Sequence, residues 1–336
     1  MNDHPGNPHP IKHAIYRNDE ASSAVLTRRS WLLGGAASLA ALGLVGSSSA
    51  ASMKKTKPSV VLFTKHVGWM DYTQLADALA NLGFDGADLT VRPGGHVLPE
   101  NVERDLPKAV EAIRKVGLEV MMITTDISDP RQKDTEPILK TASALGIPFY
   151  RIGAWSYRGD RGILEQLNEY KPKMKDLAAM NAHYKICAGY HNHSGYGQIG
   201  GGVWDIFEML REVDPQWIGS NFDTGHAVAE GGCGAWETYF RLISSRIKMS
   251  AVKDFAWEKH PEKRWQPTFP PVGDGMVKWS SALALFKSID FTGPFSMHFE
   301  YGIAGDSEEE KQKNLLSNIR RDLSVFRALL LDAGLG

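Results

Sequence analysis

The strongest constraint on the fold is a strand-then-helix unit that recurs eight times between residues 59 and 331. Short runs of β-branched and apolar residues alternate with segments in which apolar residues recur at helical spacing. The units follow one another at roughly 30-residue intervals, the length of a strand–helix–strand crossover. The predicted strands are Ser59–Thr64, Phe84–Thr90, Leu118–Thr124, Pro148–Gly153, Tyr184–His191, Trp217–Phe222, Ile247–Lys253 and Pro294–Glu300.

The predicted helices carry their apolar residues on one face, and several end at a glycine. In the segment Asp71–Leu82, Leu75 and Leu79 are one turn apart, and Gly83 follows. Near-continuous apolar strands between helices predict a parallel sheet, and eight such units close into a barrel. An open, doubly wound sheet is the alternative, but no glycine-rich phosphate-binding motif follows the first strand. We therefore predict an α/β fold, a single (β/α)8 TIM barrel.

The barrel is preceded by a segment with the composition of an export signal. Thr27-Arg28-Arg29-Ser30 is followed by an apolar stretch from Gly34 to Gly46 and by small residues at 47–52. This order is typical of a signal peptide, and the paired arginines resemble a twin-arginine signal. The apolar run is short for a membrane span. We predict a disordered N-region and signal peptide over residues 1–52, a barrel over residues 58–333, periplasmic localisation and no stable membrane insertion after cleavage.

Charge and cysteine content exclude two classes of protein. The 38 Lys and Arg residues nearly cancel the 39 Asp and Glu residues without forming a basic block, so we expect no nucleic-acid partner. The two cysteines, Cys187 and Cys233, lie in unrelated segments and indicate no disulfide framework. Cys187 falls inside an apolar strand and is expected in the core.

Polar side chains gather where the predicted strands end. Three segments have this character: Tyr190-His191-Asn192-His193, Phe222-Asp223-Thr224-Gly225-His226 and His298-Phe299-Glu300. Alternation along each strand places His191 with His193, and His298 with Glu300, on one face. Inward-facing charges cost energy unless they are paired or bound to a metal, and barrel active sites lie at these strand ends. The sequence therefore predicts a divalent-metal site at this end of the barrel.

The order of these motifs along the eight units resembles the xylose-isomerase-like TIM barrels. The resemblance covers about residues 58–333 and rests on the Tyr-His-Asn-His run, the Asp-Thr-Gly-His run, Lys253-Asp254-Phe255 and the final Glu300. That superfamily contains sugar-phosphate isomerases and epimerases, inosose dehydratases and endonuclease IV. Balanced charge and predicted export disfavour the endonuclease.

The resemblance implies one bound divalent ion, such as Mn²⁺, Co²⁺, Mg²⁺ or Zn²⁺. Family epimerases hold it with Glu, Asp, His and Glu on strands five to eight, and Asp223 and Glu300 match the second and fourth of these. His191 stands at the strand-five position, and Ala251 stands where the strand-seven histidine is expected. The implied ligand set is His191, Asp223 and Glu300, completed by His193 or His226.

The chemistry implied by the resemblance is removal of a proton α to a carbonyl, with the metal polarising the substrate oxygens. The predicted catalytic residues are Glu300, His193 and Lys253. His191 in place of a glutamate makes the acid/base pair unsymmetrical, so loss or addition of water or an alkoxide competes with epimerisation. The alternatives are an ion pair of Glu300 with Arg151 or Lys253, and an ion pair of Lys253 with Asp254.

The residues predicted to bind substrate are His226, His298, Arg92, Trp155 and Trp257. The two tryptophans lie in long loops, residues 154–162 and 256–275, of the kind that form lids. Flat aromatic rings suit the apolar faces of a small-molecule carbohydrate, and they suit contacts within a homo-oligomer equally well. His226 has a helix cap as its alternative role, and His298 has packing.

Three functions are compatible with these residues. The first is a metal-dependent sugar isomerase or epimerase that works through an enediolate. The second is a metal-dependent lyase, dehydratase or hydratase acting on keto-sugars, 3-keto-glycosides or inososes. The third is a non-catalytic periplasmic sugar-binding barrel, which the presence of both Asp223 and Glu300 disfavours.

Overall fold

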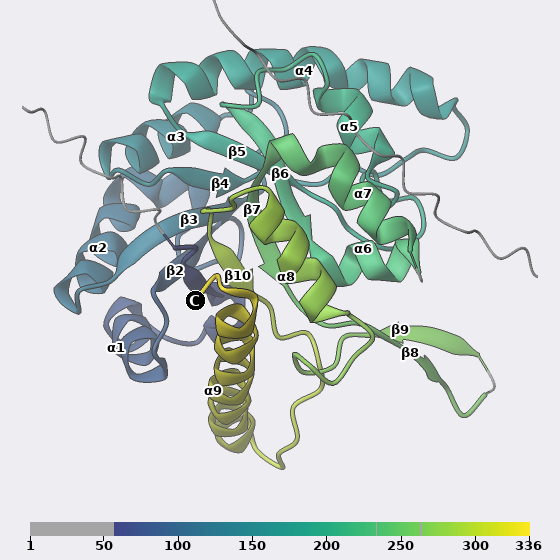
Figure 1. The fold of residues 1–336 in the computed structure, drawn as a ribbon. Helices are drawn as coiled ribbons and strands as arrows, with labels where there is room; N and C mark the ends of the chain where they lie inside the picture. The colour runs from purple at the N-terminus through teal and green to yellow at the C-terminus, as the bar shows by residue number, and fades with distance from the viewer. Residues whose placement is uncertain (1–56, 233, 263) are drawn as a thin grey trace, which may run out of the picture. The chain divides into compact units, whose positions relative to one another are not determined.

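The computed structural model describes residues 57–232, 234–262 and 264–336, so the predicted signal peptide lies outside it. Eight parallel strands close into a barrel in the order β1-β10-β7-β6-β5-β4-β3-β2, with helices around it (Figure 1). This confirms the predicted α/β barrel. The strands are β1 (Val60–Phe63), β2 (Gly86–Val91), β3 (Glu119–Thr125), β4 (Phe149–Arg151), β5 (Cys187–His191), β6 (Ile218–Asp223), β7 (Ile247–Val252) and β10 (Phe295–Met297).

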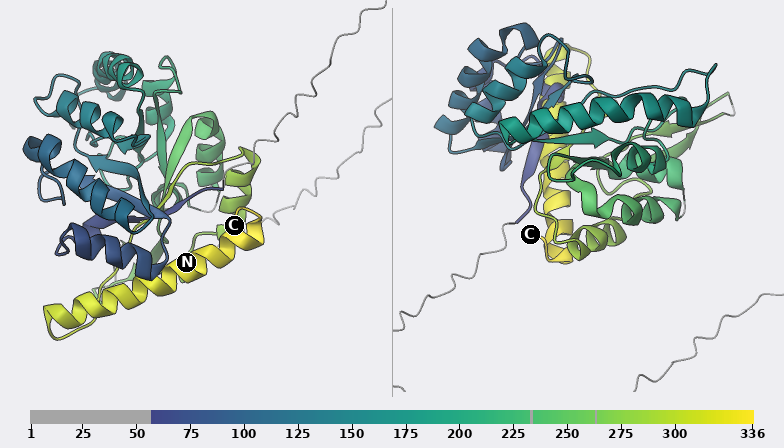
Figure 2. Two further views of the ribbon diagram at one scale, coloured as in Figure 1. Left: turned by 90° about the vertical axis from the view of Figure 1, so that its left-hand side faces the viewer. Right: turned by 90° about the horizontal axis from the view of Figure 1, so that it is seen from above.

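The helices follow the predicted alternation with one addition, the short helix α6 directly after β6. The last helix, α9, is the longest and lies along one side of the barrel (Figure 2). The α-helices are α1 (Tyr72–Leu82), α2 (Val102–Lys115), α3 (Thr135–Ala144), α4 (Ile163–Tyr184), α5 (Trp204–Leu210), α6 (Thr224–Gly231), α7 (Ala235–Ile243), α8 (Trp279–Ser288) and α9 (Glu308–Ala333). Short 3-10 turns are η1 (Thr64–Val67), η2 (Pro99–Asn101) and η3 (Ser244–Arg246).

Helix α1 shows how the local sequence sets an element's ends. The Asp71 carboxylate accepts hydrogen bonds from the backbone N–H groups of Thr73 and Gln74, and the Gln74 side chain accepts from Asp71 N. This reciprocal arrangement satisfies N–H groups that have no partner within the helix. The helix ends at Gly83, whose φ of 90° lies in the left-handed region that glycine tolerates.

Aromatic side chains fill the space between the barrel wall and helices α7, α8 and α9. Phe286 packs edge-on against Phe240 and Phe295, with ring centroids 4.9 and 5.0 Å apart, and Phe326 of α9 contacts Phe295. All four rings are buried. Truncation of such a ring to Ala costs about 3–5 kcal/mol, so this layer holds β10 against helices α7, α8 and α9. Cys187 is buried in β5, as predicted.

The segment between β7 and α8 contains a hairpin that the sequence pattern did not predict. β8 (Ala256–Lys259) pairs antiparallel with β9 (Trp265–Thr268) and projects from the barrel (Figure 1). Both strands are four residues long and Pro267 lies in one of them, so neither carries a clear strand signal. Among the described residues, no helix combines the length and apolar character needed to cross a bilayer.

Candidate metal and substrate site

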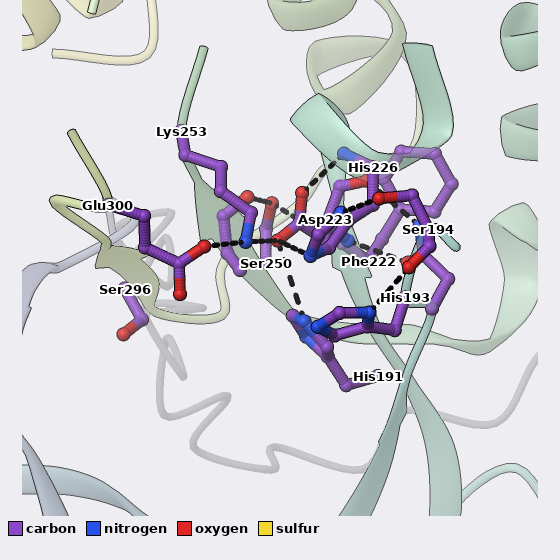
Figure 3. Close-up of polar contacts among 12 residues, drawn as sticks. His191, His193, Ser194, Phe222, Asp223, His226, Ser250, Lys253, Ser296 and Glu300 are labelled. Carbon is purple, nitrogen blue, oxygen red and sulfur yellow. Dashed lines mark hydrogen bonds and ion pairs between the residues drawn. The ribbon is translucent and has the colours of Figure 1, made fainter. Parts of the chain in front are cut away.

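The predicted site residues lie at or just beyond the ends of four neighbouring strands. β10, β7, β6 and β5 are adjacent in the barrel, so residues that follow them meet at one side of its mouth. His191 ends β5 and Asp223 ends β6. Lys253 follows β7 directly, and Glu300 lies three residues beyond β10. Figure 3 shows these side chains converging.

Asp223 is the most firmly held residue of this group. Its Oδ1 caps helix α6 by accepting from His226 N at 2.8 Å. Its backbone is clamped by the Asn192 side chain, which accepts from Asp223 N at 2.7 Å and donates to Asp223 O at 2.9 Å. The side chain is fully buried. These contacts leave Asp223 Oδ2 without a hydrogen bond among the described residues.

Around Asp223 Oδ2, three nitrogen atoms approach without making a hydrogen bond. Lys253 Nζ lies 3.4 Å away, His191 Nε2 3.5 Å and His226 Nε2 3.8 Å. One ligand atom from each of His191, Asp223 and His226 lies within 4.8 Å of the others. Within the described part of the chain, Asp223 Oδ2 and His226 Nε2 are buried and have no hydrogen-bond partner.

Unsatisfied buried polar atoms are rare, and each calls for an explanation. Two imidazoles and a carboxylate are the donors that Zn²⁺, Mn²⁺ and Co²⁺ accept. The donor set around Asp223 therefore fits a divalent ion. Asp223 and His191 belong to the predicted ligand set, and His226 was one of the two residues predicted to complete it.

Glu300, the third predicted ligand, is placed differently. Its Oε2 accepts from Lys253 Nζ at 2.7 Å, and its Oε1 lies 3.8 Å from Lys65 Nζ. Lys253 also approaches Asp223, so its ammonium lies between the two carboxylates (Figure 3). The ion pair with Lys253 is the alternative that the sequence left open for Glu300. Lys253 makes no pair with Asp254, whose carboxylate instead accepts from Phe255 N, Gly273 N, Val277 N and Trp279 Nε1.

The protonation states follow from burial and from Lys253. Burial raises the pKa of Asp223 to about 6, against the opposing effect of Lys253. Burial also acts to raise the pKa of Glu300, but the Lys253 ammonium outweighs it and lowers the value to about 2. Burial holds the pKa of both His191 and His226 well below the ordinary value. The two imidazoles are therefore neutral, as metal ligands must be.

Two further histidines line the same space. His193 Nδ1 donates to the Ser194 carbonyl at 2.8 Å, which leaves the lone pair on Nε2, and its ring lies 4.1 Å from that of His226. His298 is buried, and neither of its ring nitrogens has a partner among the described residues. Its ring stacks on Phe63 at 4.5 Å and runs nearly parallel to His191 at 5.9 Å. Both imidazoles border the trio of His191, Asp223 and His226.

The other predicted substrate-binding residues lie outside this cluster. Arg92 stands over the Phe63 ring with its guanidinium carbon 5.6 Å from the centroid. Trp155 stacks on Tyr170 of α4 at 4.4 Å and is partly buried. Trp257 lies on the hairpin, 44% exposed, with its edge against Phe255. Of the ten predicted residues, the arrangement brings together six, namely His191, His193, Asp223, His226, Lys253 and His298, and Glu300 joins them through Lys253.

Two contributing residues were not predicted. Ser194 Oγ lies 2.6 Å from His226 Nδ1, which directs the Nε2 atom of that ring toward Asp223. Phe269, beyond the hairpin, places its ring 4.8 Å from Lys253 Nζ and 5.3 Å from the His226 ring. Ser194 follows His193 directly in the sequence, and Phe269 belongs to the aromatic loop already noted. Neither position carries a spacing signal of its own.

An α/β barrel with an imidazole–carboxylate cluster at the ends of its strands defines the class of this protein. The chain belongs to the xylose isomerase-like TIM barrel family, whose model matches residues 76–327. No curated protein matches the sequence.

Solved structures with the same fold include three with named activities. A D-tagatose 3-epimerase-like protein matches over 82% of this chain and 98% of its own, with a TM-score of 0.62 and 14% identity. The 3-keto-D-glucoside 4-epimerase YcjR from E. coli matches over 81% of this chain and 100% of its own, with a TM-score of 0.61 and 13% identity. The probable 3-DHS dehydratase AsbF from Bacillus anthracis matches over 80% of this chain and 98% of its own, with a TM-score of 0.60 and 16% identity. At these identities the likeness shows the shared fold.

Proposed function

We propose that this protein is a metal-dependent sugar isomerase or epimerase that removes a proton α to a carbonyl. The observation that carries the proposal is the buried trio of His191, Asp223 and His226, in which three buried polar atoms have no hydrogen-bond partner among the described residues. Membership of the xylose isomerase-like family supports it, as do the named epimerases among proteins of the same fold.

The residues around the trio supply the groups that proton transfer needs. A divalent ion held by His191, Asp223 and His226 would polarise a substrate carbonyl. Glu300 is ionised and faces the same space, so it is the proposed base on one side. His193 Nε2 carries a lone pair and is the proposed acid or base on the other side.

Lys253 sets the strength of the proposed base. While its ammonium bonds Glu300 at 2.7 Å, the carboxylate has a pKa of about 2 and is a weak base. A substrate oxygen that takes the Lys253 hydrogen bond would raise the pKa of Glu300. Substrate binding and activation of the base would then be one event, with Lys253 moving its hydrogen bond from Glu300 to the substrate.

A lyase or dehydratase acting on keto-sugars, 3-keto-glycosides or inososes is the second candidate. One observation favours it: the two groups proposed to transfer protons are unlike, a carboxylate paired with Lys253 and an imidazole bonded to a backbone carbonyl. Unlike groups suit abstraction on one side and protonation of a leaving oxygen on the other, because the two steps need different pKa values.

One experiment separates these functions. Mn²⁺-loaded protein is incubated in deuterated water with D-fructose and with a 3-keto-glucoside, and the products are followed by NMR. Deuterium entry at carbon without elimination supports the epimerase. Release of water or aglycone supports the lyase. Metal binding without either reaction would contradict both, and would leave the sugar-binding barrel.

We also propose export through the twin-arginine pathway to the periplasm, on the basis of Arg28-Arg29 and the apolar stretch behind them. The test is fractionation of cells that express the full chain and the Arg28→Lys, Arg29→Lys double variant. We expect the wild-type chain in the periplasmic fraction and the variant in the cytoplasm. Equal periplasmic yields of the two chains would refute the twin-arginine route.

A further inference from the structure

Arg151 is the last residue of β4, and its side chain points into the barrel. It is paired in register with Thr124 of β3 on one side and with Gly189 of β5 on the other. Thr124 faces inward, since its hydroxyl donates to Asp88 at 2.8 Å and Asp88 also accepts from Ser296 of β10. Because parallel neighbours in register point to the same side of a sheet, the Arg151 side chain enters the barrel too.

The guanidinium of Arg151 reaches the level of the candidate site. His191 is two residues beyond Gly189 on β5, which is about 6.6 Å along the strand, a distance that an arginine side chain spans. Consistent with this, the Arg151 charge is one of the causes that lower the pKa of His191 and His298. Arg151 keeps partial exposure as a residue, and burial of its guanidinium lowers its pKa against the opposing charges of Asp88, Asp223 and Glu300.

Arg92 directly follows β2 and lies at the same height along the barrel axis as the candidate site. It lies two residues beyond Thr90, which is in register with Thr124, and its guanidinium carbon is 5.6 Å from the Phe63 ring. Phe63 in turn stacks on His298. The charges of Arg92 and Arg151 both act on Asp88, and Arg92 also acts on Arg151, so the two cations lie near each other at the barrel mouth.

Neither guanidinium has a hydrogen bond or ion pair within residues 57–232, 234–262 and 264–336. Lys253 and Lys65 are both matched to Glu300, and Asp223 is the carboxylate of the trio. A bound divalent ion would add two more positive charges to this space. Asp88, Asp223 and Glu300 are the carboxylates whose charges act on Arg151. Three carboxylates do not balance Arg151, Arg92, Lys253, Lys65 and a divalent ion, so an additional anion would be favoured here.

We propose that the substrate of this site is a sugar acid, whose carboxylate is bound by Arg151 and Arg92. The inference rests on the proposed function and adds the substrate class. A guanidinium pairs with a planar carboxylate through two parallel hydrogen bonds. A carboxylate is favoured over a phosphate because the donors are two side chains. Phosphate sites commonly add backbone N–H groups at a helix N-terminus.

The test compares three ketoses that differ in one group. Calorimetry measures the binding of D-fructose, D-fructuronate and D-fructose 6-phosphate to Mn²⁺-loaded protein. We expect D-fructuronate to bind at least about tenfold more tightly than the other two, from one charge-assisted pair. Arg151→Gln should weaken D-fructuronate binding about ten- to a hundredfold, and D-fructose binding less than about threefold. Arg114→Gln on α2, which removes the same charge beside Glu119, should change neither.

Thermal unfolding of the metal-free Arg151→Gln variant gives a second readout. We expect an unchanged or higher midpoint, because burial of the Arg151 guanidinium outweighs the attraction of Asp88, Asp223 and Glu300 and lowers its pKa. A lowered unfolding midpoint, together with an equal loss of binding affinity for all three ketoses, would indicate a structural role for Arg151 and would overturn the proposal. So would equal binding of D-fructose and D-fructuronate, preference for the phosphate, or no D-fructuronate binding at about 10 mM, above the usual KM range.

The failure of this inference is distinguishable from the failure of the proposed function. Calorimetry reports binding alone, whereas deuterium entry reports proton abstraction. Preference for D-fructuronate without deuterium entry would refute the isomerase and leave the anion site in place. Deuterium entry into D-fructose and D-fructuronate with equal KM would refute the anion site and leave the isomerase in place.

Discussion

Two buried aspartates on different sides of the barrel, Asp88 and Asp223, have similarly raised pKa values but differ in their hydrogen bonds. Burial raises the pKa of Asp88 and of Asp223 to about 6 in each case. Both oxygens of Asp88 are satisfied, by Thr124 at 2.8 Å and Ser296 at 2.7 Å. Asp223 uses one oxygen to cap α6 and leaves the other without a hydrogen bond among the described residues. A perturbed pKa alone therefore does not mark a site; the unsatisfied atom does.

The same contrast extends to the neighbours of each aspartate. Around Asp88, Thr64 and Thr90 bond each other at 3.3 Å. Around Asp223, buried nitrogens of His191, His226 and His298 have no hydrogen-bond partner among the described residues. Fully satisfied networks stiffen a core, whereas buried polar atoms without a partner are costly, a cost that a bound ligand would remove. The comparison predicts that changes near Asp88 alter stability, and that changes near Asp223 alter metal binding.

The largest expected effect is that of Asp223→Asn. The amide keeps the cap on α6 but removes the anionic ligand, so Mn²⁺ affinity should fall more than about a hundredfold. Isothermal titration of the chelator-treated protein measures it, with far-ultraviolet circular dichroism to confirm folding. Asp88→Asn is the matched control and should bind Mn²⁺ as the wild type does. Wild-type affinity in Asp223→Asn would remove the metal from the proposal.

Ser296→Ala tests the closed network. It removes one of the two donors to Asp88 and leaves a buried carboxylate oxygen unsatisfied, which costs about 2–3 kcal/mol of unfolding free energy. Urea denaturation at neutral pH measures this, and Mn²⁺ affinity should not change. A stable variant with impaired metal binding would show that the two regions are not separate.

The effect of Asp88→Asn on stability should depend on pH. The folded-state pKa of Asp88, about 6, lies above the unfolded value of 3.8. Ionised Asp88 therefore lowers stability above pH 6, and this cost disappears below about pH 4. The stability of Asp88→Asn relative to wild type should thus be greatest near pH 8 and should decline by on the order of 3 kcal/mol toward pH 4. Urea titrations across this range check it, and a constant difference would contradict the pKa assignment.

The smallest expected effect is that of Ser194→Ala. The Ser194 hydroxyl, 2.6 Å from His226 Nδ1, fixes the orientation of the ring. Its loss should weaken Mn²⁺ binding about tenfold, the usual cost of losing a group that orients a metal ligand. Ser194→Thr keeps the hydroxyl and should restore most of the affinity. If both variants bind alike, Ser194 does not orient His226.

Much of the fold and part of the site could be predicted from the sequence. Strand-and-helix alternation predicted the barrel, and residue order predicted that His191, Asp223 and Glu300 would meet at one end. The sequence could not predict that Lys253 would lie between Asp223 and Glu300, because the reach of a long side chain depends on packing. The hairpin and α6 were not predicted, because both are too short to show a periodic pattern of apolar residues.

Arg151 illustrates the same limit. It lies in a predicted strand, and nothing in the spacing shows whether its side chain enters the barrel or makes a direct ion pair. The register with Gly189 and Thr124 supplies that information. Which side chains remain without partners is a property of the assembled barrel.

The double use of the Asp223 carboxylate has a consequence for how an ion would be captured. Because one oxygen already starts a helix, the metal-free side chain is held in the rotamer that a complex requires. Little conformational entropy would be lost when the ion arrives, so more of the coordination energy would appear as affinity. The Asp223 side chain would then bind the ion without changing its rotamer.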